Sequence, residues 1–314
     1  MAQYIAQRLI QTVIVLLVLS ILCFLLLHFI PGDPVLTILG EEATEEEIEK
    51  LTKELGLDRP LPVQYLSWLG GVMQGDLGKS IIYREDVADM IWQRLPPTFH
   101  IGIVAFIISI LLGVPLGVVA AVRRGGWVDG FISTFANLFM AIPNFWLGLL
   151  GIYLFALKLG WLPVQGYVPL SSGFWASTKT IIMPSLVLGL SSMAILARQA
   201  RSAMLEVIMQ DYIRTARSKG LSKRVIIRKH ALKNAIIPVV TMAGIMLPHV
   251  VGGSVIVEQV FNINGLGRLM LQSVLNQDVV VVQGCLMFVA VTVALSNLLV
   301  DISYGYFDPR IRYK

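Results

Sequence analysis

Long apolar runs alternate with shorter polar segments along this chain of 314 residues. A helix that crosses a bilayer core of ~30 Å needs about 20 mostly apolar residues. Six runs meet or approach this length: 9–30, 99–122, 131–157, 180–197, 235–257 and 279–300. Because the runs are continuous rather than alternating, transmembrane strands are excluded. The pattern predicts an all-α integral membrane protein with six transmembrane helices, the first of them an uncleaved anchor.

The composition supports a membrane location. Hydrophobic residues make up 56% of the chain and charged residues 14%, and the mean hydropathy is +0.74. A soluble globular domain carries roughly 25% charged residues. This chain has too few charges to cover a water-facing surface of its size, and it is too apolar to be disordered. Its two cysteines, Cys23 and Cys285, lie in apolar runs, which excludes a disulfide-built scaffold.

The distribution of Lys and Arg predicts the orientation in the membrane. If the N-terminus is cytoplasmic, six spans return the C-terminus to the cytoplasm. In that orientation 16 of the 25 bases face the cytoplasm. Nine remain outside, and six of these lie in the segment 31–96, which is long enough to cross largely regardless of its charge. Both termini are therefore predicted to be cytoplasmic, in a multi-pass protein of the plasma (inner) membrane.

The outer segment 31–96 is acidic, with 13 Asp and Glu against 6 Lys and Arg. Part of it is predicted to be helical, because Thr44 and Glu47 match a capping box and Gly56 supplies a stop. Two interpretations stay open. The segment is either a solvated cap over the membrane domain or a docking surface for a partner outside the cell.

Catalytic and metal-binding patterns are missing from the sequence. The spans as drawn contain no Asp, Glu, Lys or Arg, whereas gradient-driven transporters usually carry ionisable residues there. His28, His100 and His249 have no second ligand at metal-binding spacing, so we interpret them as helix-packing residues. The segment 78–80 resembles the end of a phosphate loop, but Met73 replaces the required glycine. Energy for uphill transport would have to come from another subunit.

Residues 198–233 form a basic loop between the fourth and fifth spans, with ten Lys and Arg against two acids. Asp211 is predicted to cap a helix that runs through Lys219, and Gly220 to end it in a left-handed conformation. The low-bulk stretch 215–218 would let this helix lie close against a groove on a partner. From the residues alone, a docking helix and a plain basic anchor for anionic lipids are equally supported.

Several motifs resemble one family of transport proteins. They read PGDP at 31–34, LGLDRPL at 55–61, GDLG at 75–78, IPNFW at 142–146, DYIRTARSKGL at 211–221, KHALKNAIIP at 229–238 and FDPR at 307–310. The motifs extend from end to end of the chain. Together they resemble the dipeptide/oligopeptide/nickel-type permeases of ABC importers, in particular the first permease of the pair.

The resemblance implies a type I ABC-importer permease fold. Residues 1–96 would hold the N-terminal helix and the extracytoplasmic segment, 97–305 a five-helix transmembrane domain with the coupling loop 198–233, and 306–314 a cytoplasmic tail. The implied partners are a second homologous permease, two cytoplasmic ATPases that bind ATP and Mg²⁺, an extracytoplasmic solute-binding protein and membrane lipid. No cofactor or metal in this chain and no nucleic acid are implied.

The resemblance also assigns a role to the basic loop. The helix that ends at Gly220 would be the coupling helix, which sits in a cleft of an ATPase and transmits its closure to the spans. The residues expected to dock are Asp211, Tyr212, Arg214, Thr215, Ala216, Arg217, Ser218, Lys219 and Gly220. The wider superfamily has Glu-Ala-Ala where this chain has 215–217, and this departure resembles the peptide branch.

Prolines interrupt four of the predicted spans. They are Pro115, Pro143, Pro184, Pro238 and Pro248, and each permits a kink. Asn144 follows one of them and either lines a pore or forms an interhelical hydrogen bond. We therefore expect a non-catalytic permease subunit that moves di- or oligopeptides, or solutes such as nickel chelates, by alternating access. An ion-gradient-driven carrier without ATPases is the alternative.

Overall fold

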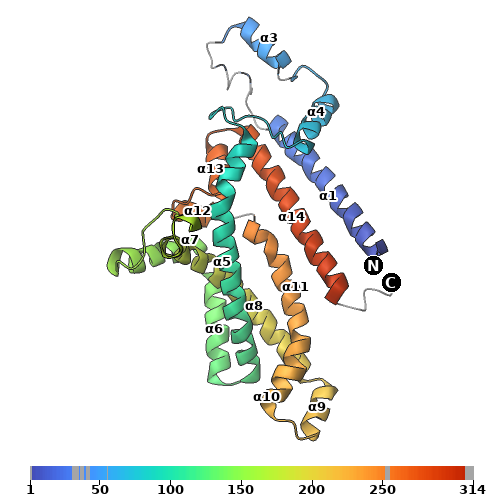
Figure 1. The fold of residues 1–314 in the computed structure, drawn as a ribbon, viewed down its shortest axis with the longest axis vertical. Helices are drawn as coiled ribbons and strands as arrows, with labels where there is room; N and C mark the ends of the chain where they lie inside the picture. The colour runs from blue at the N-terminus through green and yellow to red at the C-terminus, as the bar shows by residue number, and fades with distance from the viewer. Residues whose placement is uncertain are drawn as a thin grey trace.

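A computed structural model describes residues 2–29, 35, 39, 43–54, 56–251 and 255–307. The motif at 31–34 and the tail from 308 onward lie outside these residues. The described part is helical and elongated (Figure 1). The acidic helix α3 (Glu45–Glu54) and the apolar helix α4 (Leu61–Met73) lie at one end, and α9 (Asp211–Ser218) and α10 (Lys223–Val225) lie at the other.

The expected six-span helical architecture is confirmed. Five stretches of helix are long and apolar enough to cross a membrane: Gln3–Leu25 within α1 (Ala2–Phe29), α5 (Val87–Val122), α8 (Phe174–Ile208), Lys223–Pro248, which includes most of α11 (Leu232–Val251), and Val279–Ile302 within α14 (Val279–Phe307). A sixth consists of α6 (Trp127–Ala141) and α7 (Asn144–Gly151) with the π-helical turn η1 (Ile152–Lys158), bent by 100° at the break between α6 and α7.

Helix bounds differ most from the predicted spans in three places. The second helix begins at Val87 rather than 99, and the fourth extends from Phe174 to Ile208 rather than over 180–197. Polar residues continue these helices beyond the apolar runs, because backbone hydrogen bonding does not depend on hydrophobicity. The predicted span 235–257 is divided, since α11 ends at Val251 and a separate helix α12 covers Val255–Val260. Another short helix, α13 (Leu266–Leu275), follows.

Glycines let α5 and α8 pack closely along their length. A Cβ added at Gly117 would lie 2.3 Å from the Ala197 carbonyl oxygen, and one at Gly113 would lie 2.7 Å from that of Met193. Small residues at helix contacts are typical of membrane proteins, where close backbone approach supplies much of the packing energy. This helix pair is the centre of the fold.

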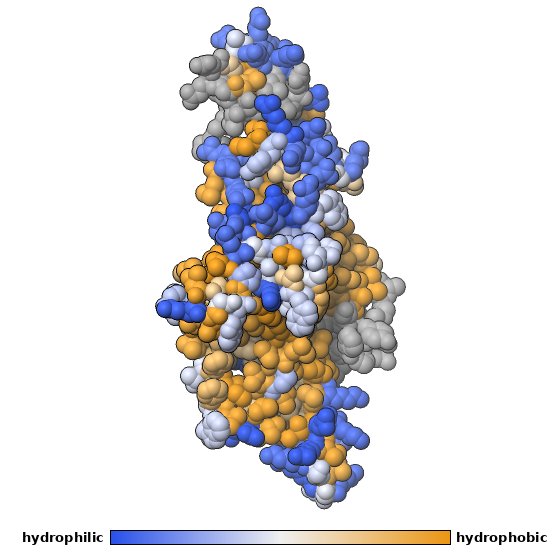
Figure 2. Space-filling view, turned by 60° about the vertical axis from the view of Figure 1, so that its left-hand side comes forward, coloured by the Kyte–Doolittle hydropathy of each residue, from blue (hydrophilic) through white to orange (hydrophobic). Residues whose placement is uncertain are grey.

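The first helix packs at the edge of the bundle, against α14 (Figure 1). Arg8 of α1 forms an ion pair with Asp301 of α14 at 3.4 Å, and the Tyr4 hydroxyl donates to the Asp301 carbonyl oxygen at 3.1 Å. The start of α1 and the end of α14 therefore lie on one side of the membrane. Figure 2 shows an apolar surface between a hydrophilic upper end and a hydrophilic lower tip, as a membrane-spanning body requires.

Candidate functional site

The basic loop 198–233 contains a short helix at the cytoplasmic end of the molecule. This helix, α9, begins at Asp211, and the capping position is Gln210. The prediction that Asp211 itself caps the helix is therefore wrong by one residue, although an acid in the first turn still complements the helix dipole. Gly220 follows the helix with φ +77°, the predicted left-handed conformation, and its N–H donates to the Arg217 carbonyl at 2.9 Å.

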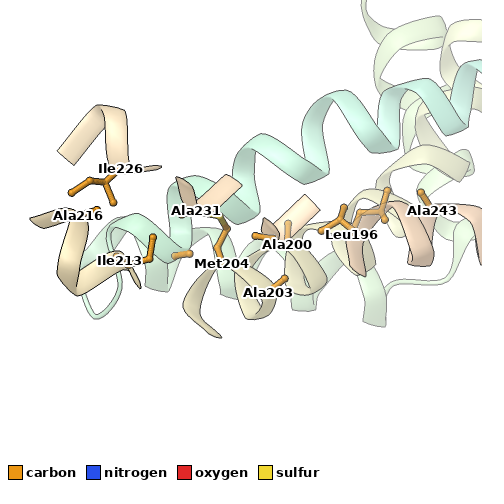
Figure 3. Close-up of a cluster of buried hydrophobic side chains, with 12 residues drawn as sticks. Leu196, Ala200, Ala203, Met204, Ile213, Ala216, Ile226, Ala231 and Ala243 are labelled. Carbon is orange, nitrogen blue, oxygen red and sulfur yellow. The ribbon is translucent and has the colours of Figure 1, made fainter. Parts of the chain in front are cut away.

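One face of α9 is buried in the chain's own core. Ile213 and Ala216, three residues apart and hence on one face, pack into a cluster with Met204, Ile226 and Ala231 (Figure 3). Ala216 was expected to present a small surface to a partner, and this expectation is wrong: the side chain is 7% exposed and points into this cluster. Its small size instead lets α9 lie close to the turn Ile226–Ala231.

The opposite face of α9 is exposed and basic. The exposed residues are Asp211, Tyr212, Arg214, Thr215, Arg217, Ser218, Lys219 and Gly220. Thr215 and Ser218 turn their hydroxyls back to the carbonyls of Asp211 and Arg214, at 3.1 and 3.2 Å. These two hydroxyl groups therefore form hydrogen bonds within the helix. The cations of Arg214, Arg217 and Lys219 consequently dominate the outward surface.

A hydrogen-bond network ties α9 to the base of α11. The Tyr212 hydroxyl donates to the carbonyl oxygen of His230 at 3.3 Å and accepts from the Asn234 side-chain amide at 2.7 Å. His230 lies in a π-helical turn, η3 (Ile226–Ala231), which leads directly into α11. Such turns often mark functional sites. The sequence gives no signal for a π-helical turn, so this connection could not be predicted.

The third span breaks at Pro143. After α6 ends at Ala141, the backbone of Ile142 and Pro143 is extended, and Asn144 begins α7. A kink is predicted here, and the structure shows a bend of 100°, so the two halves of the span lie nearly perpendicular to each other. Of the two roles considered for Asn144, the structure shows an interhelical hydrogen bond, because the Ser191 hydroxyl of α8 donates to its side-chain oxygen at 2.7 Å.

The sequence pattern did not predict a bidentate ion pair near the cytoplasmic ends of α6 and α8. Arg201 donates to both carboxylate oxygens of Asp129, at 2.6 and 2.8 Å, and the backbone N–H of Gly125 adds a third bond at 3.0 Å. Both charged residues lie outside the predicted apolar runs, and only Arg201 is among the bases that predict the orientation in the membrane. The pair holds the α5–α6 turn against α8.

Buried carboxylates also organise the outer side. Glu258 of α12 is 2% exposed, accepts from the Thr98 hydroxyl at 2.7 Å and from the backbone N–H of Arg268 at 2.8 Å. Burial raises the pKa of Glu258, and these hydrogen bonds oppose the shift. Asp278, at the start of α14, accepts from the Ser80 hydroxyl and so fixes the outer segment to the bundle. Among the described residues, no group of three or more His, Cys, Asp or Glu could hold a metal.

Helical spans, an exposed basic helix on one side and an acidic segment on the other define a membrane-embedded transport subunit. Two family models match the chain: the binding-protein-dependent transport system inner membrane component over residues 113–313, and its N-terminal counterpart over residues 1–102. The chain belongs to this family. It is a permease subunit of a binding-protein-dependent ABC importer in the inner membrane, and such a subunit works with an ATPase and a solute-binding protein.

Relatives match over the whole length. A putative peptide transport system permease protein of Brucella abortus is 42% identical over 313 residues, covering 100% of both chains. The glutathione transport system permease protein GsiC of Escherichia coli is 40% identical, and the oligopeptide transport system permease protein AppB of Bacillus subtilis is 39% identical, again with 100% coverage of both chains. Among solved structures, the inward-facing MetNI methionine ABC transporter shares the fold, with TM-score 0.58 and 22% identity over 70% of this chain and 96% of that chain.

Proposed function

We propose that this chain forms half of the translocation pathway of a peptide importer. The relatives named for peptide, oligopeptide and glutathione transport support a peptide-class solute. The other half would be a second, homologous permease. Two cytoplasmic ATPase subunits would bind ATP and Mg²⁺ and drive the paired chains between outward- and inward-open packings. This chain itself would carry out no chemistry.

The observation that carries the proposal is the two-sided construction of α9. Its buried face, Ile213 and Ala216, packs into a cluster shared with α8 and η3, while the cations of Arg214, Arg217 and Lys219 project from the molecule. A helix that is basic and exposed at the end of the molecule suits a cleft with acidic residues on its rim. Complementary charge favours the encounter of two partners and fixes how they align. We therefore assign α9 as the coupling helix that docks on an ATPase. A plain lipid anchor would not need a packed helix.

Movement of α9 would reach the spans through two connections. The buried cluster joins it to α8, and the Tyr212 network joins it to α11. Because packed cores have discrete arrangements rather than continuous ones, a displaced α9 would carry both helices with it. On the outer side, the acidic segment that Ser80 and Asp278 hold against the bundle would form part of the surface where the binding protein delivers solute.

The proposal is tested by peptide uptake into proteoliposomes that contain the complete transporter. ATP is enclosed in the lumen, and the loaded binding protein is added outside. We expect uptake to require ATP and to be lost in Gly220→Pro, because proline cannot adopt the φ of +77° found at this position. Gly160→Ala is the matched control, since Gly160 also has a positive φ, +65°, but lies in an outer loop with open space around it.

Two results would contradict the proposal. Uptake that continues without ATP and stops when the proton gradient is dissipated would identify an ion-gradient-driven carrier. Unchanged uptake in Gly220→Pro, with the chain inserted normally, would show that α9 does not couple ATP hydrolysis to transport.

A further inference from the structure

Arg198 lies within α8, ten residues before the helix ends, whereas the charge pattern of the sequence places it at the start of the cytoplasmic basic loop 198–233. Its guanidinium Nη1 lies 3.5 Å from the sulfur of Met140, the penultimate residue of α6. The preceding residue, Phe139, accepts a hydrogen bond from Ser191 through its carbonyl oxygen at 3.5 Å. The guanidinium therefore lies at the level where α6 ends and the chain turns at Pro143.

This level is far from the cytoplasmic surface. Asp129, which accepts from the α5–α6 turn at Gly125, precedes Met140 by three helical turns. At 1.5 Å per residue, the two positions are separated by about 16 Å along α6, or roughly half of the ~30 Å apolar core of a bilayer. Helical side chains point toward the N-terminus of their helix, so the long Arg198 side chain reaches toward the bilayer centre.

Arg198 has no counter-ion within the part of the chain that the structure describes. Its neighbour Arg201, one turn away on α8, is paired with both oxygens of Asp129. Arg198 is exposed, and the contact that it makes is to a thioether, a weak acceptor. An unpaired arginine at membrane depth is unfavourable against lipid, so such residues face a water-filled path or a ligand.

The backbone at this level supports a solute path. The residues Ile142 and Pro143 are extended between two helices, and Pro143 is exposed. Non-helical backbone at membrane depth is tolerated where it is buried in protein or lines a cavity, and transporters build solute sites at such discontinuous helices. Ser191 lies two turns from Arg198 on α8, hence on the same face, and bonds Asn144 at the break.

We propose that Arg198 forms a carboxylate-binding site on the translocation pathway, at the level where the third span breaks. Its ligand is the carboxylate of the passing solute, such as the C-terminal carboxylate of a peptide. A guanidinium presents two parallel N–H donors that match the two oxygens of a carboxylate. The proposal rests on the proposed function, because it needs this chain to line the path of a peptide.

The test compares a tripeptide, Ala-Ala-Ala, with its C-terminal amide. Uptake of each is measured in proteoliposomes of the complete transporter, at peptide concentrations that saturate the binding protein as judged by its fluorescence. The variants are Arg198→Met, which keeps the length without the charge, and Arg198→Lys, which keeps the charge. Arg124→Met, in the exposed α5–α6 turn, is the matched control. Co-purification with the ATPase checks that each variant assembles.

We expect wild type to import the free acid about tenfold faster than the amide or more, as one charge-assisted contact allows. Arg198→Met should bring the acid down to the amide's rate, Arg198→Lys should keep most of the preference, and Arg124→Met should keep all of it. An equal loss for both peptides in Arg198→Met would overturn the proposal and indicate a partner in the second permease. No loss for either would indicate a lipid contact. If wild type imports neither peptide with ATP, the proposed function itself fails.

Discussion

Truncating Ile213 should separate ATP hydrolysis from transport. This side chain is 0% exposed and is the larger of the two that fix α9 on the chain. Replacing a buried isoleucine by alanine costs about 2–5 kcal/mol. An isolated helix shorter than ~12 residues is marginal in water, so α9, with 8 residues, depends on this packing.

The expected size of the effect follows from that free energy. A loss of about 3 kcal/mol lowers the ratio of docked to undocked α9 by roughly 100-fold, since 1.4 kcal/mol corresponds to a factor of ten. In Ile213→Ala the partner subunits should still hydrolyse ATP, while the amount of peptide imported per ATP falls at least tenfold. Ile213→Val, which removes one methyl group for about 0.5–1.5 kcal/mol, should retain most of the coupling.

Two measurements check this reasoning. Hydrogen–deuterium exchange over residues 211–220 reports whether α9 remains docked, and the ratio of peptide imported to ATP hydrolysed in proteoliposomes reports coupling. Ile213→Ala should speed exchange in this segment and leave exchange in the middle of α5 unchanged. The reasoning is refuted if exchange increases and coupling is intact, or if α9 remains protected after the truncation.

Three further changes have defined outcomes. Gly117→Ala places a Cβ 2.3 Å from a carbonyl oxygen of α8 and should sharply lower the yield of assembled transporter. Gly130→Ala, which has no neighbour within 4 Å, should leave the yield unchanged. Equal yields of the two variants on purification would contradict the packing argument. Asp129→Asn should lower the thermal midpoint of the purified complex. The decrease should be smaller than for a fully buried ion pair, because the Arg201 side chain is 32% exposed. The double variant Asp129→Arg with Arg201→Asp, which exchanges the two charges, should recover part of the lost stability. Tyr212→Phe removes two hydrogen bonds, each worth about 1 kcal/mol, and should lower peptide imported per ATP severalfold; no change would remove the Tyr212 network from the coupling route.

The apolar runs determined the class and the number of spans, because a bilayer imposes one length on every crossing helix. The distribution of Lys and Arg determined the orientation, because cytoplasmic loops carry an excess of these residues. The motifs at 211–221 and 229–238 identified the family, because the residues of each motif are neighbours in the chain and can be recognised without knowledge of the fold. The left-handed Gly220 and the Thr44–Glu47 capping box were predictable as well, and both are found.

Other features depend on residues that are distant in sequence. Nothing local to Ala216 shows whether the face that it shares with Ile213 packs on this chain or on a partner, because only the tertiary packing decides between them. Asp129 and Arg201 are 72 positions apart, and Glu258 and Thr98 are 160 apart, so each pair is created by folding.

The sequence alone therefore determined what kind of protein this is and which long basic loop lies in the cytoplasm. Only the tertiary structure decided how the basic helix is held, where the third span breaks, and that Arg198 reaches the level of that break without a counter-ion among the residues that the structure describes. The physical reason is that hydrophobicity and charge act residue by residue along the chain. Close packing and buried hydrogen bonds are instead satisfied between helices, whose contacts the linear pattern does not specify.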